Sequence, residues 1–219
     1  MTSSSQKISI ADMRREYTLA GLREEDAADD PFEQFATWFD EAMDAQVIES
    51  NAMTLATASP DGHPSARIVL LKGFDRNGFV FFTNYEGRKG SELTENPNAA
   101  LLFYWAQLTR QIRVEGVVAR VTFEESDAYF QSRSPLSRLG AWASRQSSVI
   151  AGRNILDDRL AELQQQYPDD NIPLPPFWGG FRLVPHTFEF WHGRPNRLHD
   201  RLRYALHPDG LWKIERLSP

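Results

Sequence analysis

The spacing of hydrophobic positions changes along this chain, and its first clear pattern predicts a helix. Asp30-Pro31 is typical of a helix start, with Asp30 as the cap and Glu33 completing a capping box. The helix should run to about Gln46 and pack against a sheet. One face of it gathers four apolar residues at helical spacing: Phe32, Phe35, Phe39 and Met43.

From residue 52 onward, apolar residues mostly alternate with polar ones, which predicts strands. The predicted strands span 52–58, 63–74, 79–84, 99–105, 110–123, 179–193, 201–207 and 211–217. Asp61-Gly62 and Asn77-Gly78 indicate hairpin turns, and Gly116 indicates a bulge or bend. A short helix is expected over 87–97 and longer ones within 124–166. The sum is a mainly β fold, a Greek-key-like antiparallel barrel with flanking helices.

The polar composition of residues 1–30 predicts a mobile arm, and residues 31–219 then form a single domain with helical insertions at about 124–166. The N-terminus has no apolar stretch of signal-peptide length, and no run approaches a membrane span. A cytoplasmic protein is therefore the default expectation.

Composition narrows the chemistry. The formal net charge is −6 and there is no cysteine. Bulk attraction to nucleic acid or to an anionic membrane is not expected, and thiolate metal sites and cysteine nucleophiles are excluded. Any anion site must be local. The chain has no glycine-rich dinucleotide or phosphate loop and no H-E-x-x-H or G-x-S-x-G motif. Its five histidines lack metal-ligand spacing, so no metal is expected.

Two groups of cations stand beside apolar strands. Arg67 and Lys72 flank an apolar run, so either they meet an anion near the core or they cap strand ends in solvent. Arg88 and Lys89 open a predicted helix after Thr83, where cations oppose the helix dipole. That position favours an anion held by the first turn over a merely charged turn.

Further candidates lie in the second half of the chain. Tyr129 and Arg133 are four residues apart on a predicted helix, and with Ser137 they suit a phosphate monoester. An ordinary surface face explains the same spacing. In the run from Glu189 to Arg201, Arg197 and His199 fall on one face if the chain is extended, and the pattern alone leaves His199 either structural or catalytic.

Several stretches together resemble the pyridoxamine 5′-phosphate oxidase family. They are MRREYTLAGL, RIVLLKGFD, FFTNYEGRKG, RQIRVEG, YFQSRSPLSRLGAWASRQSS, PFWGGFRLVP and EFWHGRPNRLHDRLRY, in this order from about Met13 to the last strand. The resemblance implies an FMN-binding split barrel that works as a homodimer, with each flavin at the subunit interface.

The resemblance also implies site residues. FMN contacts would be Arg67, Ile68, Val69, Leu70, Leu71, Lys72, Phe82, Thr83, Arg88, Lys89, Gln111, Gln146, Ser147, Trp191 and Arg201. Substrate contacts would be Arg14, Tyr17, Lys72, Tyr129, Arg133, Ser137, Arg197 and His199, with Arg197 and His199 catalytic. Arg14 and Tyr17 would make the N-terminal arm a lid.

The reaction implied by the family is oxidation of pyridoxine or pyridoxamine 5′-phosphate to pyridoxal 5′-phosphate. A hydride would pass from C4′ to FMN, and O₂ would be reduced to H₂O₂. The chain departs from the family's frequent Arg-Pro-Arg, since it reads Arg133-Ser134-Pro135-Leu136 and lacks one cation. The alternatives are a split-barrel flavin oxidoreductase with another substrate, a non-catalytic protein that binds FMN or pyridoxal phosphate, and a structural β-barrel dimer.

Overall fold

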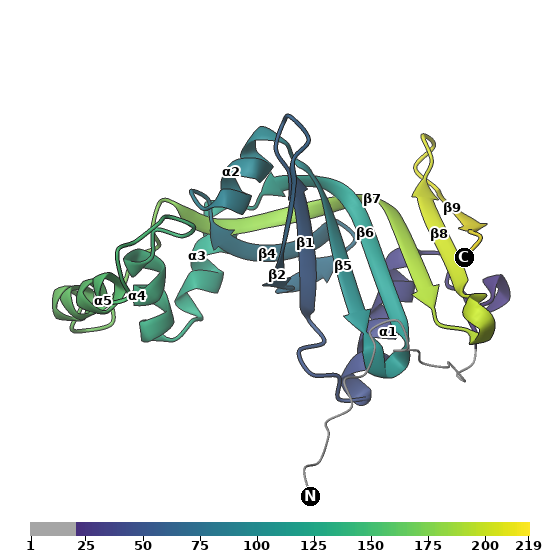
Figure 1. Cartoon of the computed structure of the whole chain (residues 1–219), viewed down its shortest axis with the longest axis horizontal. Coiled ribbons are helices and arrows are strands. Elements are labelled where there is room, and N and C mark those ends of the chain that lie inside the picture. Colours follow the sequence, from purple (N-terminus) through teal and green to yellow (C-terminus); the bar gives the residue numbers. More distant parts are fainter. Residues whose placement is uncertain (1–20) are drawn as a thin grey trace, which may run out of the picture.

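The protein is described over residues 21–219 by a computed structural model, and its centre is a curled nine-stranded sheet (Figure 1). The strands are β1 (Ala52–Ala58), β2 (Pro64–Leu70), β3 (Gly73–Asp75), β4 (Gly78–Asn84), β5 (Asn98–Trp105), β6 (Arg110–Arg120), β7 (Trp178–His192), β8 (Asp200–Leu206) and β9 (Trp212–Arg216). The helices are α1 (Pro31–Asp44), α2 (Arg88–Glu95), α3 (Phe123–Gln131), α4 (Pro135–Ala143) and α5 (Asn154–Gln166), with short 3₁₀ turns at Glu24–Asp26, Ala106–Leu108 and Pro195–Arg197.

The strand order explains the curled shape. Strands follow one another as β2-β1-β5-β6-β7-β4-β3, and β8 and β9 continue from β7. Every pairing is antiparallel. The long strand β7 pairs with β4 along its first half and with β8 along its second. The predicted mainly β, antiparallel barrel with flanking helices is confirmed.

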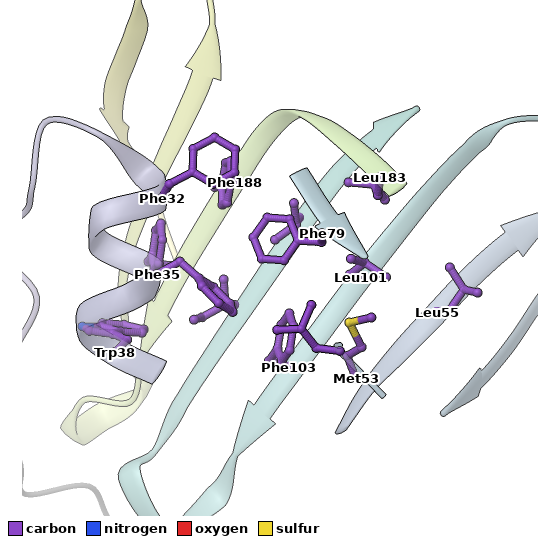
Figure 2. Packing of buried hydrophobic residues seen from close by; sticks show 14 of the residues in the cluster. Phe32, Phe35, Trp38, Met53, Leu55, Phe79, Leu101, Phe103, Leu183 and Phe188 are labelled. Atoms are coloured by element: carbon purple, nitrogen blue, oxygen red, sulfur yellow. The ribbon is translucent and has the colours of Figure 1, made fainter. Parts of the chain in front are cut away.

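Helix α1 covers the inner face of the sheet and closes the main core (Figure 2). Asp30 caps it by accepting a hydrogen bond from the Phe32 amide at 2.8 Å. Phe35 is fully buried, with its ring centroid 4.8 Å from that of Phe79. The predicted burial of Met43 at the end of the apolar face was wrong, because this side chain is about half exposed. The helix turns so that two other residues are buried: Trp38 and Ala42.

The turn predictions succeed where glycine is physically required. Gly62 and Gly78 both have positive φ angles, 87° and 128°, which residues with a side chain rarely adopt. The register of β6 against β7 shifts between Glu115 and Gly116, which confirms the predicted bulge. The strand expected over 63–74 is interrupted, and it forms β2 and β3 with Leu71 and Lys72 between them.

Helices α3, α4 and α5 form a flank with its own small core at one end of the sheet (Figure 1). Phe130, Leu139 and Leu163 from the three helices pack around Trp178, the first residue of β7. This packing fixes α3 and α4 against the strands that carry the candidate site. No helix within residues 21–219 is both long enough and apolar enough to cross a membrane.

Candidate active site

A cavity of about 380 Å³ opens where β2, β4, α2 and α3 meet. Its lining residues are Arg67, Ile68, Val69, Leu70, Lys72, Phe82, Thr83, Lys89, Tyr129, Arg133, Gln146 and Trp178. Four of them are cationic, and no carboxylate lines the cavity in the part of the chain that the structure describes. On a chain with net charge −6, this concentration of positive charge makes the cavity an anion site.

Arg67 is held beside the cavity by a buried network centred on Glu92 of α2. The Arg67 guanidinium donates to Thr57 Oγ1 at 2.6 Å, to Ser65 Oγ at 2.5 Å and to Glu92 Oε2 at 3.2 Å. Arg88 donates to the other Glu92 oxygen at 2.8 Å. Burial would by itself raise the pKa of Glu92, but the hydrogen bonds from Ser65, Thr57 and the two arginines lower it to about 2. Glu92 is therefore an anion that holds two arginines.

Lys89, the residue after Arg88 in the first turn of α2, also lines this wall. Its Nζ donates to Gln146 Oε1 at 2.6 Å and to Thr83 Oγ1 at 3.3 Å. Burial lowers the pKa of Lys89, and the charge of Arg67 lowers it further. A buried ammonium whose hydrogen-bond partners here are neutral favours an incoming anion.

The loop after α4 touches the first turn of α2 at two points. Ser147 Oγ accepts a hydrogen bond from the Arg88 amide at 3.2 Å. A Cβ atom at Gly87 would lie 2.6 Å from Gln146 Oε1, so glycine permits this close approach. The contact holds Gln146 and Ser147 beside the amino end of α2, where backbone N–H groups are available to an anion.

Three stacked aromatic rings form another part of the cavity wall. The Phe82 centroid lies 4.0 Å from that of Tyr129 and 5.6 Å from that of Trp178, and both pairs are nearly parallel. Lys72 Nζ lies 5.8 Å from the Tyr129 centroid. The wall gives the cavity an apolar surface suited to a planar ring, with cations at its edge.

Arg133 supplies the clearest sign that a ligand is expected. Its guanidinium carbon lies 4.9 Å from the Trp178 centroid, and burial lowers its pKa. Its Nη1 atom is buried and has no hydrogen-bond partner among the described residues. An unpaired buried donor is costly. A second cavity of about 330 Å³ adjoins here and is lined by Arg133 and Ser137, so a phosphate ester fits these donors.

A second cluster of candidate residues lies at the carboxyl end of β7. Gln111 of β6 is paired with Trp191 of β7, and Trp191 is paired with Arg201 of β8. The His199 ring lies 4.7 Å from the Trp191 ring. Arg197 has a φ of 60°, a strained conformation for a residue with a side chain, of the kind that concentrates at functional sites.

Backbone and carboxylate contacts orient this C-terminal cluster. The Arg194 amide donates to His199 Nδ1 at 3.1 Å. Burial lowers the pKa of His199, and the charge of Arg197 lowers it further. Arg201 Nε donates to Glu189 Oε1 at 2.8 Å, and Glu189 is only 3% exposed. The ring of His199 and the guanidinium of Arg201 are thus both positioned within the chain.

The structure places most of the predicted site residues in two groups within one chain. Those that line the two adjoining cavities are Arg67, Ile68, Val69, Leu70, Lys72, Phe82, Thr83, Lys89, Tyr129, Arg133, Ser137 and Gln146. Those in the C-terminal cluster line neither cavity: Gln111, Trp191, Arg197, His199 and Arg201. Arg88 and Ser147 lie at the first turn of α2, whereas Leu71 is buried in the main core. Arg14 and Tyr17 lie outside the described residues.

Sequence reasoning missed three residues that shape these groups. Glu92 had a visible signal, because it lies four residues after Arg88 on a predicted helix and this spacing is typical of an ion pair. Trp178 and Glu189 had no local signal, since their partners come from distant segments. Arg197 and His199 were predicted to share one face of an extended segment. Arg197 instead ends a 3₁₀ turn that spans Pro195–Arg197, so the two residues do not lie in a strand.

Comparison with solved structures places the chain in the split-barrel class. PhzG from Burkholderia lata, solved with tetrahydrophenazine-1-carboxylic acid, is 35% identical over 89% of this chain and 95% of its own, with a TM-score of 0.84. A pyridoxamine 5′-phosphate oxidase-related, FMN-binding protein from Nostoc punctiforme shares the fold at 20% identity, with a TM-score of 0.70 over 88% of this chain and all of its own.

Comparison of the sequence then gives the family. Residues 39–167 match the model described as pyridoxamine 5′-phosphate oxidase, and residues 178–219 match the pyridoxine 5′-phosphate oxidase C-terminal dimerisation region. A pyridoxine/pyridoxamine 5′-phosphate oxidase of Cupriavidus metallidurans is 60% identical over 96% of this chain and 99% of its own, and one of Nostoc sp. is 57% identical over 96% and 98%. The chain belongs to the pyridoxamine 5′-phosphate oxidase family and is an oxidoreductase.

Proposed function

We propose that this protein oxidises pyridoxine 5′-phosphate and pyridoxamine 5′-phosphate to pyridoxal 5′-phosphate, with FMN as its cofactor. The observation that carries the proposal is the cavity of about 380 Å³ whose four cations face no lining carboxylate in residues 21–219. The reaction named for relatives at 57–60% identity supports it. Both the cofactor and the substrate are phosphate esters with a planar ring, which is what cations beside an aromatic wall would bind.

The residues divide between two phosphate groups. The FMN phosphate would bind near Arg67, Arg88 and Lys89 at the amino end of α2, where Gln146 and Ser147 also lie. The substrate phosphate would bind on the opposite side, between α3 and α4. The side chains proposed for it are Lys72, Tyr129, Arg133 and Ser137, and the unpaired Nη1 atom of Arg133 supports this assignment.

The residues of the C-terminal cluster fit a homodimer in which each active site is formed by both copies of the chain. The C-terminal cluster comes from β6, β7 and β8, and Figure 1 shows β8 at the opposite end of the long axis from α4 and α5. Residues 178–219 match a dimerisation region. The cavity of one copy would therefore be completed by Trp191, Arg197, His199 and Arg201 of a second copy, with FMN between the two.

Within such a site, Arg197 would hold the substrate pyridine ring and His199 would meet the substituent on C4′. Because Nδ1 of His199 accepts a hydrogen bond from the Arg194 amide, the neutral ring carries its proton on Nε2 and donates from there. Burial and the charge of Arg197 lower the pKa of His199, which favours the neutral ring. When bound, FMN would accept a hydride from C4′ and pass the electrons to O₂, giving H₂O₂.

The test uses reconstituted protein with FMN and measures pyridoxal 5′-phosphate and H₂O₂ formed from each phosphorylated substrate. Unphosphorylated pyridoxine and a tetrahydrophenazine carboxylic acid serve as comparison substrates, because PhzG shares the fold. Turnover of the phosphorylated compounds is expected. Flavin binding without H₂O₂ release would favour a non-catalytic carrier, and turnover of the phenazine compound alone would assign another substrate.

Arg133→Gln tests the phosphate assignment. A hydrogen bond to a charged group contributes about 1.5–3 kcal/mol, so KM for pyridoxine 5′-phosphate should rise roughly 10- to 100-fold while kcat changes little. The matched control is Arg153→Gln, which removes an exposed arginine ahead of α5 that pairs with Asp157 and lines neither cavity. An unchanged KM in Arg133→Gln would contradict the assignment.

A further inference from the structure

The segment after Arg133 departs from the family's Arg-Pro-Arg pattern, because Ser134 stands where that pattern has proline and Pro135 stands where it has the second arginine. Ser134 is the N-cap of α4, and its Oγ accepts a hydrogen bond from the Ser137 amide at 3.4 Å. The same hydroxyl donates to Ser137 Oγ at 2.8 Å. Ser134 therefore binds both the backbone N–H and the hydroxyl of Ser137, the residue that our proposed function assigns to the substrate phosphate.

This geometry decides how the Ser137 hydroxyl is used. A serine hydroxyl has one proton to donate and two lone pairs. Since Ser137 Oγ accepts the proton of Ser134, its own proton remains available to a further acceptor. Ser137 lines the cavity of about 330 Å³ together with Arg133, whose buried Nη1 has no partner in the described chain. A phosphate in this cavity would accept from the Ser137 hydroxyl and lie beside the Arg133 guanidinium.

We propose that Ser134 is a positioning residue for substrate binding: it orients the Ser137 hydroxyl as a donor to the substrate phosphate, where the chain lacks the second cation of the family pattern. The inference rests on the proposed function. A serine that acts only as a helix cap would stabilise α4 and leave phosphate binding unaffected, so an experiment must separate the two roles.

Ser134→Gly removes the hydroxyl and keeps the helix, because glycine at an N-cap costs only a few tenths of a kcal/mol relative to serine. We expect KM for pyridoxine 5′-phosphate to rise about 2- to 10-fold, the range of one hydrogen bond, with kcat and the Kd for FMN unchanged. Inhibition by inorganic phosphate should weaken in proportion. Ser134→Thr retains a hydroxyl and should restore the wild-type KM.

Two further variants make the role falsifiable. Ser132→Ala is the matched control, because it removes an exposed hydroxyl that donates to the Tyr129 backbone carbonyl and lines neither cavity. In a double-mutant cycle, Ser134→Gly should have no further effect on KM once Ser137 is alanine, since Ser134 acts through Ser137. A normal KM in Ser134→Gly, or an equal rise in the Ser137→Ala background, would overturn the inference. Failure of the wild-type protein to oxidise either substrate would instead refute the proposed function.

Discussion

Replacing Glu92 by glutamine should destabilise the protein in a way that depends on pH. Glu92 is 7% exposed and accepts hydrogen bonds from Arg67, Arg88 and two hydroxyl groups. Glutamine has nearly the same shape but no charge. The variant therefore leaves two guanidinium groups without their anion, of which that of Arg67 is largely buried.

Two estimates of the loss in the free energy of unfolding agree. The fall in the pKa of Glu92 from 4.5 to about 2 corresponds to roughly 3 kcal/mol, at about 1.4 kcal/mol per pH unit. Removing one partner of a buried ion pair costs about 3–5 kcal/mol. Since glutamine keeps part of the hydrogen bonding, we expect a loss of about 2–4 kcal/mol in the free energy of unfolding near pH 7.

The pH dependence gives the sharper test. Because the pKa is lower in the folded protein, the stabilisation by Glu92 is complete above the unfolded pKa of 4.5. It is lost as the pH falls from there toward 2. The difference in the free energy of unfolding between wild type and Glu92→Gln should therefore shrink by about 1 kcal/mol or more between pH 7 and roughly pH 3.5. Other acidic groups titrate in both proteins and cancel in this difference.

The assay is urea unfolding of FMN-free protein at one fixed chain concentration, because oligomerisation makes apparent stability depend on concentration. Glu95→Gln is the matched control, being an exposed glutamate on the same helix. It should change stability by less than about 0.5 kcal/mol at every pH. The reasoning would be refuted if the unfolding free energy of Glu92→Gln differed from wild type by the same amount at every pH. A difference below about 1 kcal/mol near neutrality would refute it as well.

Two other predictions test the shared site and the fold. Arg133→Gln and Arg197→Ala should each lower kcat/KM for pyridoxine 5′-phosphate, but a mixture unfolded and refolded together should regain about a quarter of the wild-type activity at subsaturating substrate, because half of the dimers are mixed and each has one intact site; no recovery would argue against a shared site. Gly78→Ala should cost about 3 kcal/mol or more of stability, because Gly78 has a φ of 128° and a Cβ there would lie 2.0 Å from the Leu183 carbonyl oxygen. Gly73→Ala, whose Cβ would meet open space, should change thermal stability little, and equal midpoints for the two variants would contradict the steric argument.

The sequence allowed prediction where a local pattern has one physical solution. Asn77-Gly78 predicted a turn because the backbone there needs a positive φ, and the structure has one. The helix after Asp30 was predicted from its cap, but the end of its buried face was not. Met43 fits helical spacing as well as Ala42 does, and only contact with the sheet selects between them.

The candidate site shows the same limit. Tyr129 and Arg133 were placed on one helix, yet α3 ends at Gln131 and Arg133 follows it. Both residues still line the cavity, because Trp178 from β7 packs against each of them. That packing depends on a strand more than 40 residues away, which no local spacing reveals.

Each half of the proposed shared site is held together by a buried carboxylate between two arginines. Glu92 binds Arg67 and Arg88 beside the cavity, and Glu189 binds Arg113 and Arg201 on the C-terminal cluster. In the C-terminal cluster Arg113 also pairs with Glu115, so that network is neutral overall. Beside the cavity, the single carboxylate of Glu92 cannot neutralise two guanidinium groups, so that network retains one positive charge. That charge would be available to an anionic ligand, and fixing the arginines before the ligand arrives reduces the entropy lost on binding. An acidic protein can in this way present ordered positive charge at the cavity, and the fixed C-terminal cluster of a second copy would complete the FMN site only in the dimer.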